Sequence, residues 1–233
     1  MSKKILALLI AFCSFQLVNA EDKQCCGKVE IAPAYLHIDV LEHEKTVRSI
    51  DMPAVRAEGN WLIYDGLSLK PTILYGSNDS DLFAAQLGLG YCVPWRQFIF
   101  TPSAGCGYTS LNTRTKLPMF QLFHLKENFK SCSPYLAFDL TWNFCKDWRI
   151  AGSIQYAWSR THTTIKGLGK FNSRAEGPSY SALLEYDVTP EWSVNFGAAY
   201  NVSLDRERFG IRGYGFKLGI ARWFYTNTCC STN

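Results

Sequence analysis

Cysteine is the residue whose number and placement in this chain point most directly to chemistry. The 233-residue sequence has nine cysteines, and only Cys13 lies within the first 20 residues. Vicinal pairs stand near both ends of the chain; the eight others are Cys25, Cys26, Cys92, Cys106, Cys132, Cys145, Cys229 and Cys230. An even number of cysteines in an exported chain is typical of disulfides. We predict disulfide roles for these eight, with small apolar packing as the alternative.

The histidines show no arrangement that is typical of catalysis. The chain has four, which are His37, His43, His124 and His162. None stands near a serine and a carboxylate in a recognisable triad pattern. No Cys-x-x-Cys or clustered Cys-His spacing indicates a metal site either. We therefore predict no enzymatic activity, no metal and no cofactor.

Five charged residues occur in segments that alternate between apolar and small polar residues, always on the small polar side. They are Lys70, Asp139, Glu185, Asp187 and Lys217. Opposite charges in a narrow interior pair with one another, because an unpaired charge there loses its hydration. These positions therefore predict a structural ion-pair network, with a gate or a selectivity ring as the alternative.

The strands that carry these residues are predicted from an alternation of apolar and polar residues with a period of two. In 192–204, apolar residues such as Trp192 and Phe196 alternate with small polar ones such as Ser193 and Asn195. Successive side chains of a strand point to opposite faces, so each such segment has one apolar and one polar face. The same pattern predicts eight strands, at 66–76, 82–93, 97–109, 132–144, 149–161, 179–188, 192–204 and 212–225.

The connections between these strands alternate in length. Short ones carrying a tryptophan, at 93–96, 145–148 and 189–192, alternate with longer ones at 110–131, 162–178 and 205–211. Membrane barrels have short turns on the periplasmic side, long loops outside, and aromatic girdles at both interfaces. This pattern predicts a periplasmic girdle of Trp95, Trp148, Trp192 and Phe224. Basic residues of the long loops would then contact lipopolysaccharide phosphates or an acidic partner.

The first third of the mature chain permits two strand counts. Residues 28–40 resemble a strand, 42–58 is a charged stretch, and 59–64 ends in an Asp65-Gly66 turn signal. Eight strands with an N-terminal plug and ten strands without one both keep the strand number even. We favour ten. Another registration joins 60–76 into one strand and uses Met119–Lys126 as a further one.

The first 20 residues have the composition of a secretory signal peptide. Lys3 and Lys4 precede an apolar stretch at 5–18, and Val18-Asn19-Ala20 fits a cleavage site. We expect cleavage after Ala20 and a single all-β domain over 21–233. Without Lys3 and Lys4, 22 of the 24 basic residues remain against 20 acidic ones, so the composition gives no case for nucleic acid.

Two architectures fit exported strands with one apolar and one polar face: a secreted sandwich, and a barrel turned inside out in lipid. The polar faces are rich in Gly, Ala, Ser and Asn rather than Lys, Glu and Thr, and aromatic residues make up 15% of the chain. These features favour a transmembrane antiparallel up-and-down β-barrel of eight to ten strands.

With the signal, the tryptophan-bearing turns and the final strand Gly213–Phe224 in view, the chain resembles small bacterial outer-membrane barrels of the OmpA/OmpX/OmpW kind. Its cysteines also resemble those of bacterial envelopes that are crosslinked by disulfides. The resemblance implies an integral protein of the bacterial outer membrane. We predict a structural or surface-interaction role for it, with disulfides to other envelope proteins. A small-solute pore, a lipid-modifying enzyme and a secreted sandwich are the alternatives.

Overall fold

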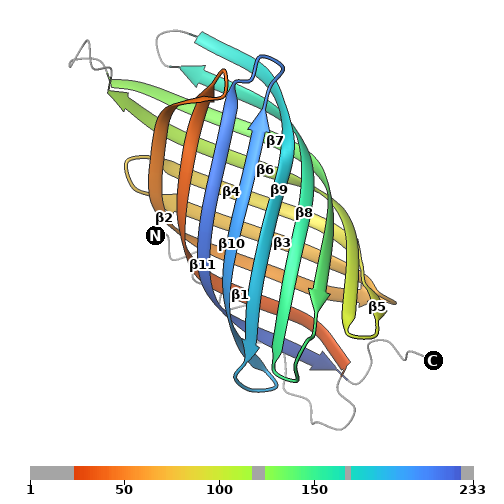
Figure 1. Ribbon diagram of the computed structural model, residues 1–233. Helices are drawn as coiled ribbons and strands as arrows, with labels where there is room; N and C mark the ends of the chain where they lie inside the picture. Colours follow the sequence, from red (N-terminus) through yellow and green to blue (C-terminus); the bar gives the residue numbers. More distant parts are fainter. Residues whose placement is uncertain (1–23, 117–123, 166–168, 227–233) are drawn as a thin grey trace.

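The computed structural model describes residues 24–116, 124–165 and 169–226, and these residues form one antiparallel sheet closed into a barrel (Figure 1). Among them, no helix is long and apolar enough to span a membrane. The strands are β1 (Gln24–Glu42), β2 (Lys45–Tyr64), β3 (Leu67–Ser77), β4 (Asp81–Tyr91), β5 (Val93–Trp95), β6 (Phe98–Lys116), β7 (His124–Trp142), β8 (Trp148–Ile165), β9 (Gly169–Asp187), β10 (Trp192–Leu204) and β11 (Gly210–Thr226).

Neighbouring strands in sequence are neighbours in space, and two further pairings close the circle. β1 pairs with β11, and β4 pairs with β6. The three-residue β5 continues the edge of β4 along β6 after an interruption at Cys92, so the barrel wall has ten strands. The prediction of ten strands is confirmed, and eight strands with a plug is wrong. Joining 60–76 into one strand is also wrong, because Tyr64 and Leu67 face each other across a turn.

The alternation in the sequence becomes an apolar outer wall and a polar interior. On β11, Phe216, Leu218 and Ile220 are each more than half exposed, whereas Ala221 on the opposite face is fully buried. On β10, Ser193 and Asn195 are buried between exposed Trp192 and Phe196. A closed sheet with an apolar exterior is the reverse of a sandwich, so the secreted sandwich is wrong.

Both ends of the described chain lie at one end of the barrel, because Gln24 of β1 pairs with Thr226 of β11. We call this the terminal end, and the opposite one the distal end. The Asp65-Gly66 turn at the terminal end has positive φ at both residues, 33° and 79°, as its sequence signal predicts. At the distal end, β1 and β2 meet in a tight turn at His43 and Glu44.

Two predictions for connecting segments are wrong, and the charged stretch near the N-terminus is mostly strand. The charged stretch 42–58 lies mostly in β2, where buried or half-buried positions alternate with exposed ones over residues 48–55. The expected loops 110–131 and 162–178 are largely strand: β6 pairs with β7 as far as Lys116 and His124, and β8 pairs with β9 as far as Ile165 and Gly169. Residues 117–123 and 166–168 lie outside the described residues.

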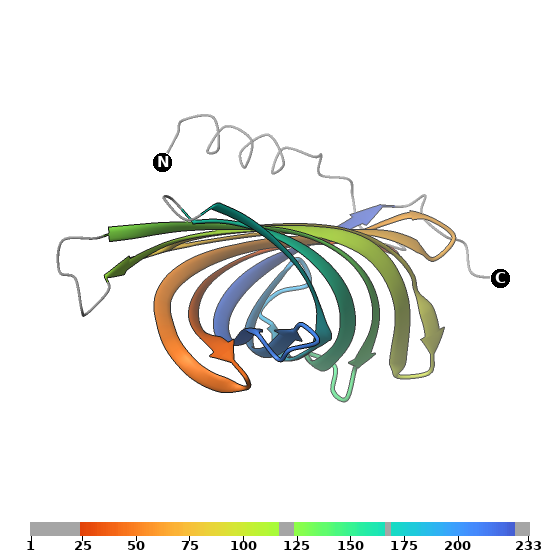
Figure 2. The ribbon, with the colours of Figure 1, turned by 90° about the horizontal axis from the view of Figure 1, so that it is seen from above.

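The distal ends of β6, β7, β8 and β9 rise beyond their neighbours and form what we call the distal sheet. The last pairing of β4 with β6 is at Asn112, and the last pairing of β10 with β9 is at Glu176. Beyond these points β6 and β9 each have a neighbour on one side only. The green ends of β6 and β7 lean away from the barrel axis in the view from above (Figure 2). The barrel wall therefore continues distally as a four-stranded sheet.

Candidate functional site

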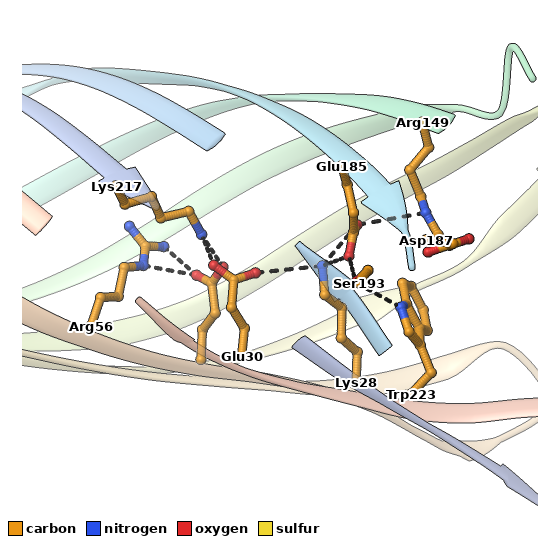
Figure 3. Close-up of polar contacts among 10 residues, drawn as sticks. Lys28, Glu30, Arg56, Arg149, Glu185, Asp187, Ser193, Lys217 and Trp223 are labelled. Carbon is orange, nitrogen blue, oxygen red and sulfur yellow. Dashed lines mark hydrogen bonds and ion pairs between the residues drawn. The ribbon is translucent and has the colours of Figure 1, made fainter. Parts of the chain in front are cut away.

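A dense group of charges fills the barrel interior towards the terminal end (Figure 3). At one side of it, the Lys217 ammonium of β11 donates hydrogen bonds to Glu30 of β1 and Glu58 of β2. The side chain of Glu30 is only 1% exposed. Arg56 also pairs with Glu58, at 2.6 Å. Three strands are thus joined through charges that have lost most of their water.

Lys28 connects this group to a second one at the other side. Its ammonium lies 3.4 Å from Glu30 and 2.8 Å from Glu185 of β9. Arg149 of β8 is 3.6 Å from Glu185 and also pairs with Asp187.

The indole of Trp223 and the hydroxyl of Ser193 complete the second group. The indole nitrogen donates to the Ser193 hydroxyl at 3.1 Å, and that hydroxyl donates to Glu185. The Arg149 guanidinium lies 4.2 Å from the Trp223 ring centroid, a cation–π contact. Each charge near Trp223 therefore has an oppositely charged or aromatic neighbour.

We call this set the lumen network; its four cations and four carboxylates balance to zero, and they are Lys28, Arg56, Arg149, Lys217, Glu30, Glu58, Glu185 and Asp187. Sequence reasoning named Glu185, Asp187 and Lys217. It missed the other five, which are Arg149 of β8 and four residues of β1 and β2, the part of the chain where it left the strand count open. The missed signal was alternation, since Lys28 and Glu30 flank the outward Val29.

Lys70 and Asp139, the other two predicted residues, form a separate pair between β3 and β7. Tyr135 of β7 is 8% exposed and crosses the same region of the interior. A Cβ added at Gly88 would meet the Tyr135 hydroxyl at 2.4 Å, and one at Gly105 would meet it at 2.6 Å. The inward glycines of β4 and β6 therefore provide the space that this ring occupies.

Towards the distal end the interior is apolar instead. Four buried side chains form this cluster, which we call the distal apolar cluster: Ile50, Met52, Leu82 and Leu111. Leu36, Ile38, Val40, Leu74 and Phe129 pack against it. A cavity of about 320 Å³ remains in the interior; charged residues of β1–β3, β7 and β11 line it together with small residues of β8–β11.

A third polar group lies on the outer wall at the distal end of β1, β2 and β11. On the outward face, each member is the next residue towards the distal end: His37 after Tyr35 on β1, Asp51 after Pro53 on β2, and Arg212 after Tyr214 on β11. The His37 ring lies 2.7 Å from Asp51 and 3.2 Å from Asp39. We call His37, Asp39, Asp51 and Arg212 the outer polar cluster.

Hydrogen bonds set the protonation of this cluster. The bond to Asp51 raises the pKa of His37 above its usual 6.5, and the same bond lowers the pKa of Asp51. Hydrogen bonds from Ser49 and Arg212 lower the pKa of Asp39. Nowhere in 24–116, 124–165 and 169–226 do three or more His, Cys, Asp or Glu side chains gather in a form that could hold a metal.

The four cysteines with described side chains are free thiols: Cys92, Cys106, Cys132 and Cys145. Cys106 and Cys132 both face outward on neighbouring strands, with their sulfurs 3.6 Å apart. Their register is diagonal, because Cys132 is opposite Tyr108. Cys145 is exposed in a turn at the terminal end. Of the terminal pairs, only the backbone of Cys25 and Cys26 is described, and Cys229 and Cys230 lie outside the described residues.

The predicted girdle residues gather at the terminal end. Trp95, Trp148 and Trp192 are 58%, 40% and 44% exposed on the outer wall. Phe224 is half-buried there, beside the guanidinium of Arg222. Their role as a membrane girdle stays a prediction. The signal peptide and its cleavage after Ala20 lie outside the described residues.

Comparison with known proteins supports the fold and goes no further. No protein-family model matches the chain, and no curated protein matches its sequence. Among solved structures, the outer membrane protease OmpT from Escherichia coli is similar with a TM-score of 0.55, 14% identity, and coverage of 90% of this chain and 99% of that one. Neisserial surface protein A (NspA) has a TM-score of 0.46 and 13% identity, with 85% and 97% covered. The chain thus has the closed ten-stranded fold of outer-membrane barrels.

Proposed function

We propose that the protein is an integral barrel of the bacterial outer membrane that conducts no solutes and acts as a structural and surface-interaction protein. The observation that carries this proposal is an interior that side chains fill apart from a cavity of about 320 Å³. The lumen network occupies the terminal half and the distal apolar cluster occupies the distal half. An eight- to ten-stranded barrel has an interior that side chains largely fill, so little free cross-section is left for a pore.

Residence in the membrane is supported by the exposed wall. Each strand turns an apolar side outward, and closing the sheet leaves no unpaired edge along the barrel body, as a hydrocarbon environment requires. The terminal end, with its short turns and both chain ends, would face the periplasm. The distal sheet would then project outward from the cell.

A conductance measurement distinguishes this proposal from the alternative, a small-solute pore. We expect the mature chain, folded into planar bilayers, to show no stable current steps. A Tyr135→Ala/Met52→Ala variant removes two large interior side chains and should conduct more than the parent if it folds, which shows that the assay reports the lumen. Stable current steps from the parent barrel would overturn the proposal and favour the pore.

Disulfide crosslinking between envelope proteins is a second candidate role, favoured by the exposed thiol of Cys145 at the terminal end. The adjoining first and last strands also bring Cys25 to the end where the chain exits towards Cys229, because Cys25 pairs with Tyr225. We expect reducible high-mass species on non-reducing gels of fresh envelopes, diminished by Cys145→Ser. Cys92→Ser is the control, since its sulfur accepts a hydrogen bond from Thr101. Monomer alone without reductant would exclude this role.

The proposal includes no catalytic role. OmpT is a protease, but that activity is a property of OmpT, and its likeness to this chain is one of fold. The outer polar cluster places one histidine between two carboxylates, so it is the place to test. Peptide or lipid turnover by the folded barrel that disappears in His37→Ala would show that it is an enzyme.

A further inference from the structure

A basic group stands on the outer wall of β7, β8 and β9, immediately distal to the apolar surface. On β8, the exposed Trp158 is followed on the same face by Arg160 and then His162, and both are exposed. Lys130 of β7 and Arg174 of β9 occupy exposed outward positions beside them. We call Lys130, Arg160, His162 and Arg174 the wall patch.

The register places two of these cations directly opposite each other on neighbouring strands. Arg160 of β8 is directly opposite Arg174 of β9, and Lys130 of β7 is directly opposite His162. Like charges in directly opposed positions destabilise a sheet. The imidazole of His162 lies 2.5 Å from the amide oxygen of Asn172, which is a neutral partner.

No carboxylate with a described side chain forms an ion pair with these cations, whereas other arginines of the barrel have such partners. Arg56, Arg149 and Arg212 each pair with an acidic side chain. Among the described side chains, Arg160, Arg174 and Lys130 have no ion pair. The outward carboxylate nearest in sequence, Glu176, already accepts a hydrogen bond from Tyr156. The wall patch thus holds three permanent cations against one carboxylate.

We propose that the wall patch binds the phosphate groups of an outer-leaflet lipid, such as those of lipopolysaccharide. This inference rests on the membrane orientation proposed above. Arg160 stands two residues beyond Trp158, or about 7 Å at the rise of a strand. Aromatic rings of barrels lie at headgroup level, so the guanidinium groups reach the depth of lipid phosphates. Arginine forks bind phosphate through two hydrogen bonds, and a phosphate between Arg160 and Arg174 would relieve their repulsion.

The test measures lipid binding to the full mature chain, folded in detergent, by native mass spectrometry. The probes are diphosphoryl lipid A, the same lipid after dephosphorylation, and inorganic phosphate. The variant is Arg160→Gln/Arg174→Gln. The control is Arg96→Gln/Lys146→Gln, which removes the same charge from exposed turns at the terminal end. Heat-dependent gel migration verifies that each protein is folded.

We expect the diphosphoryl lipid to bind at least about tenfold more tightly than its dephosphorylated form, because hydrogen bonds between charged groups supply the difference. The Arg160→Gln/Arg174→Gln variant should lose this preference, and the terminal-end control should keep it. Equal binding of both lipids, unchanged binding by the variant, or equal occupancy by inorganic phosphate would overturn the inference. A chain without heat-dependent migration would instead contradict the proposed membrane barrel, so the two failures are distinguishable.

Discussion

The strongest prediction about what stabilises this barrel concerns Lys217. Its ammonium is the cation shared by Glu30 and Glu58, and its side chain is only 13% exposed. The variant Lys217→Met keeps the length of the aliphatic chain and removes the charge. The lumen network then holds four carboxylates against three cations, in an interior that is largely shielded from water.

The expected loss of unfolding free energy depends on which cations remain near Glu30 and Glu58. Removing one partner of a buried ion pair costs about 3–5 kcal/mol, because the other charge stays buried and unpaired. Lys28 still lies 3.4 Å from Glu30, and Arg56 still lies 2.6 Å from Glu58. Glu58 is also 23% exposed, so water screens part of its charge. We therefore expect a loss at the lower end of the range, about 3 kcal/mol.

The measurement is urea-induced unfolding of the barrel in lipid vesicles, followed by tryptophan fluorescence and extrapolated linearly to zero urea. Adding Glu30→Gln to Lys217→Met restores the balance to three charges of each sign, so the double variant should regain more than half of the lost free energy. Lys70→Met is the control. Both members of its pair with Asp139 are nearly a quarter exposed, and the expected cost is about 1 kcal/mol or less.

Two results would refute this reasoning. One is a Lys217→Met barrel whose unfolding free energy lies within about 1 kcal/mol of the parent, which would mean that the network carries no net stabilisation. The other is a double variant less stable than Lys217→Met alone, because the carboxylate of Glu30 would then stabilise the barrel without its cation. Either result would remove the electrostatic account of the filled lumen.

The remaining predictions concern the outer wall and the packing of the interior. The pKa of His37, measured by NMR titration, should lie above 6.5 and should fall in Asp51→Asn, because the bond to Asp51 favours the charged ring. The stability that the charged His37 contributes is fully present below pH 6.5 and is lost as pH rises through the pKa of the folded state. Cys106 and Cys132, with sulfurs 3.6 Å apart, should form a disulfide in oxidised envelopes, detected by peptide mapping without reductant. Gly105→Ala should destabilise the barrel by about 1–3 kcal/mol in urea unfolding, since its Cβ would meet a backbone oxygen of β4 at 2.4 Å.

Each of these predictions has a control or a contradicting result. An unchanged His37 pKa in Asp51→Asn would show that the hydrogen bond does not hold the ring charged. Full alkylation of both thiols before reduction would exclude the Cys106–Cys132 disulfide. Gly152→Ala is the control for Gly105→Ala, because its added Cβ would approach no atom closer than 3.9 Å and should leave the unfolding free energy nearly unchanged.

The sequence by itself determined where the chain is extended and which side of each strand faces out. Alternation along a strand is local, because neighbouring side chains point to opposite faces whatever the strand pairs with. Trp192, Phe196 and Tyr200 could therefore be assigned to one face before any partner strand was known. The Asp65-Gly66 turn was equally local, since its positive φ angles suit those two residues.

Only the tertiary structure decided the number of strands, how far each strand extends towards the distal end, and which charged side chains pair inside the barrel. Ten strands follow from the pairing of β1 with β11, which joins residues about two hundred positions apart and has no local signature. Lys217 and Glu30 are 187 positions apart, so their contact depends on the register of two strands. The distal sheet was predicted as loops because polar residues alternate weakly there, and the backbone pairing that makes these segments strands comes from neighbours across the hairpin.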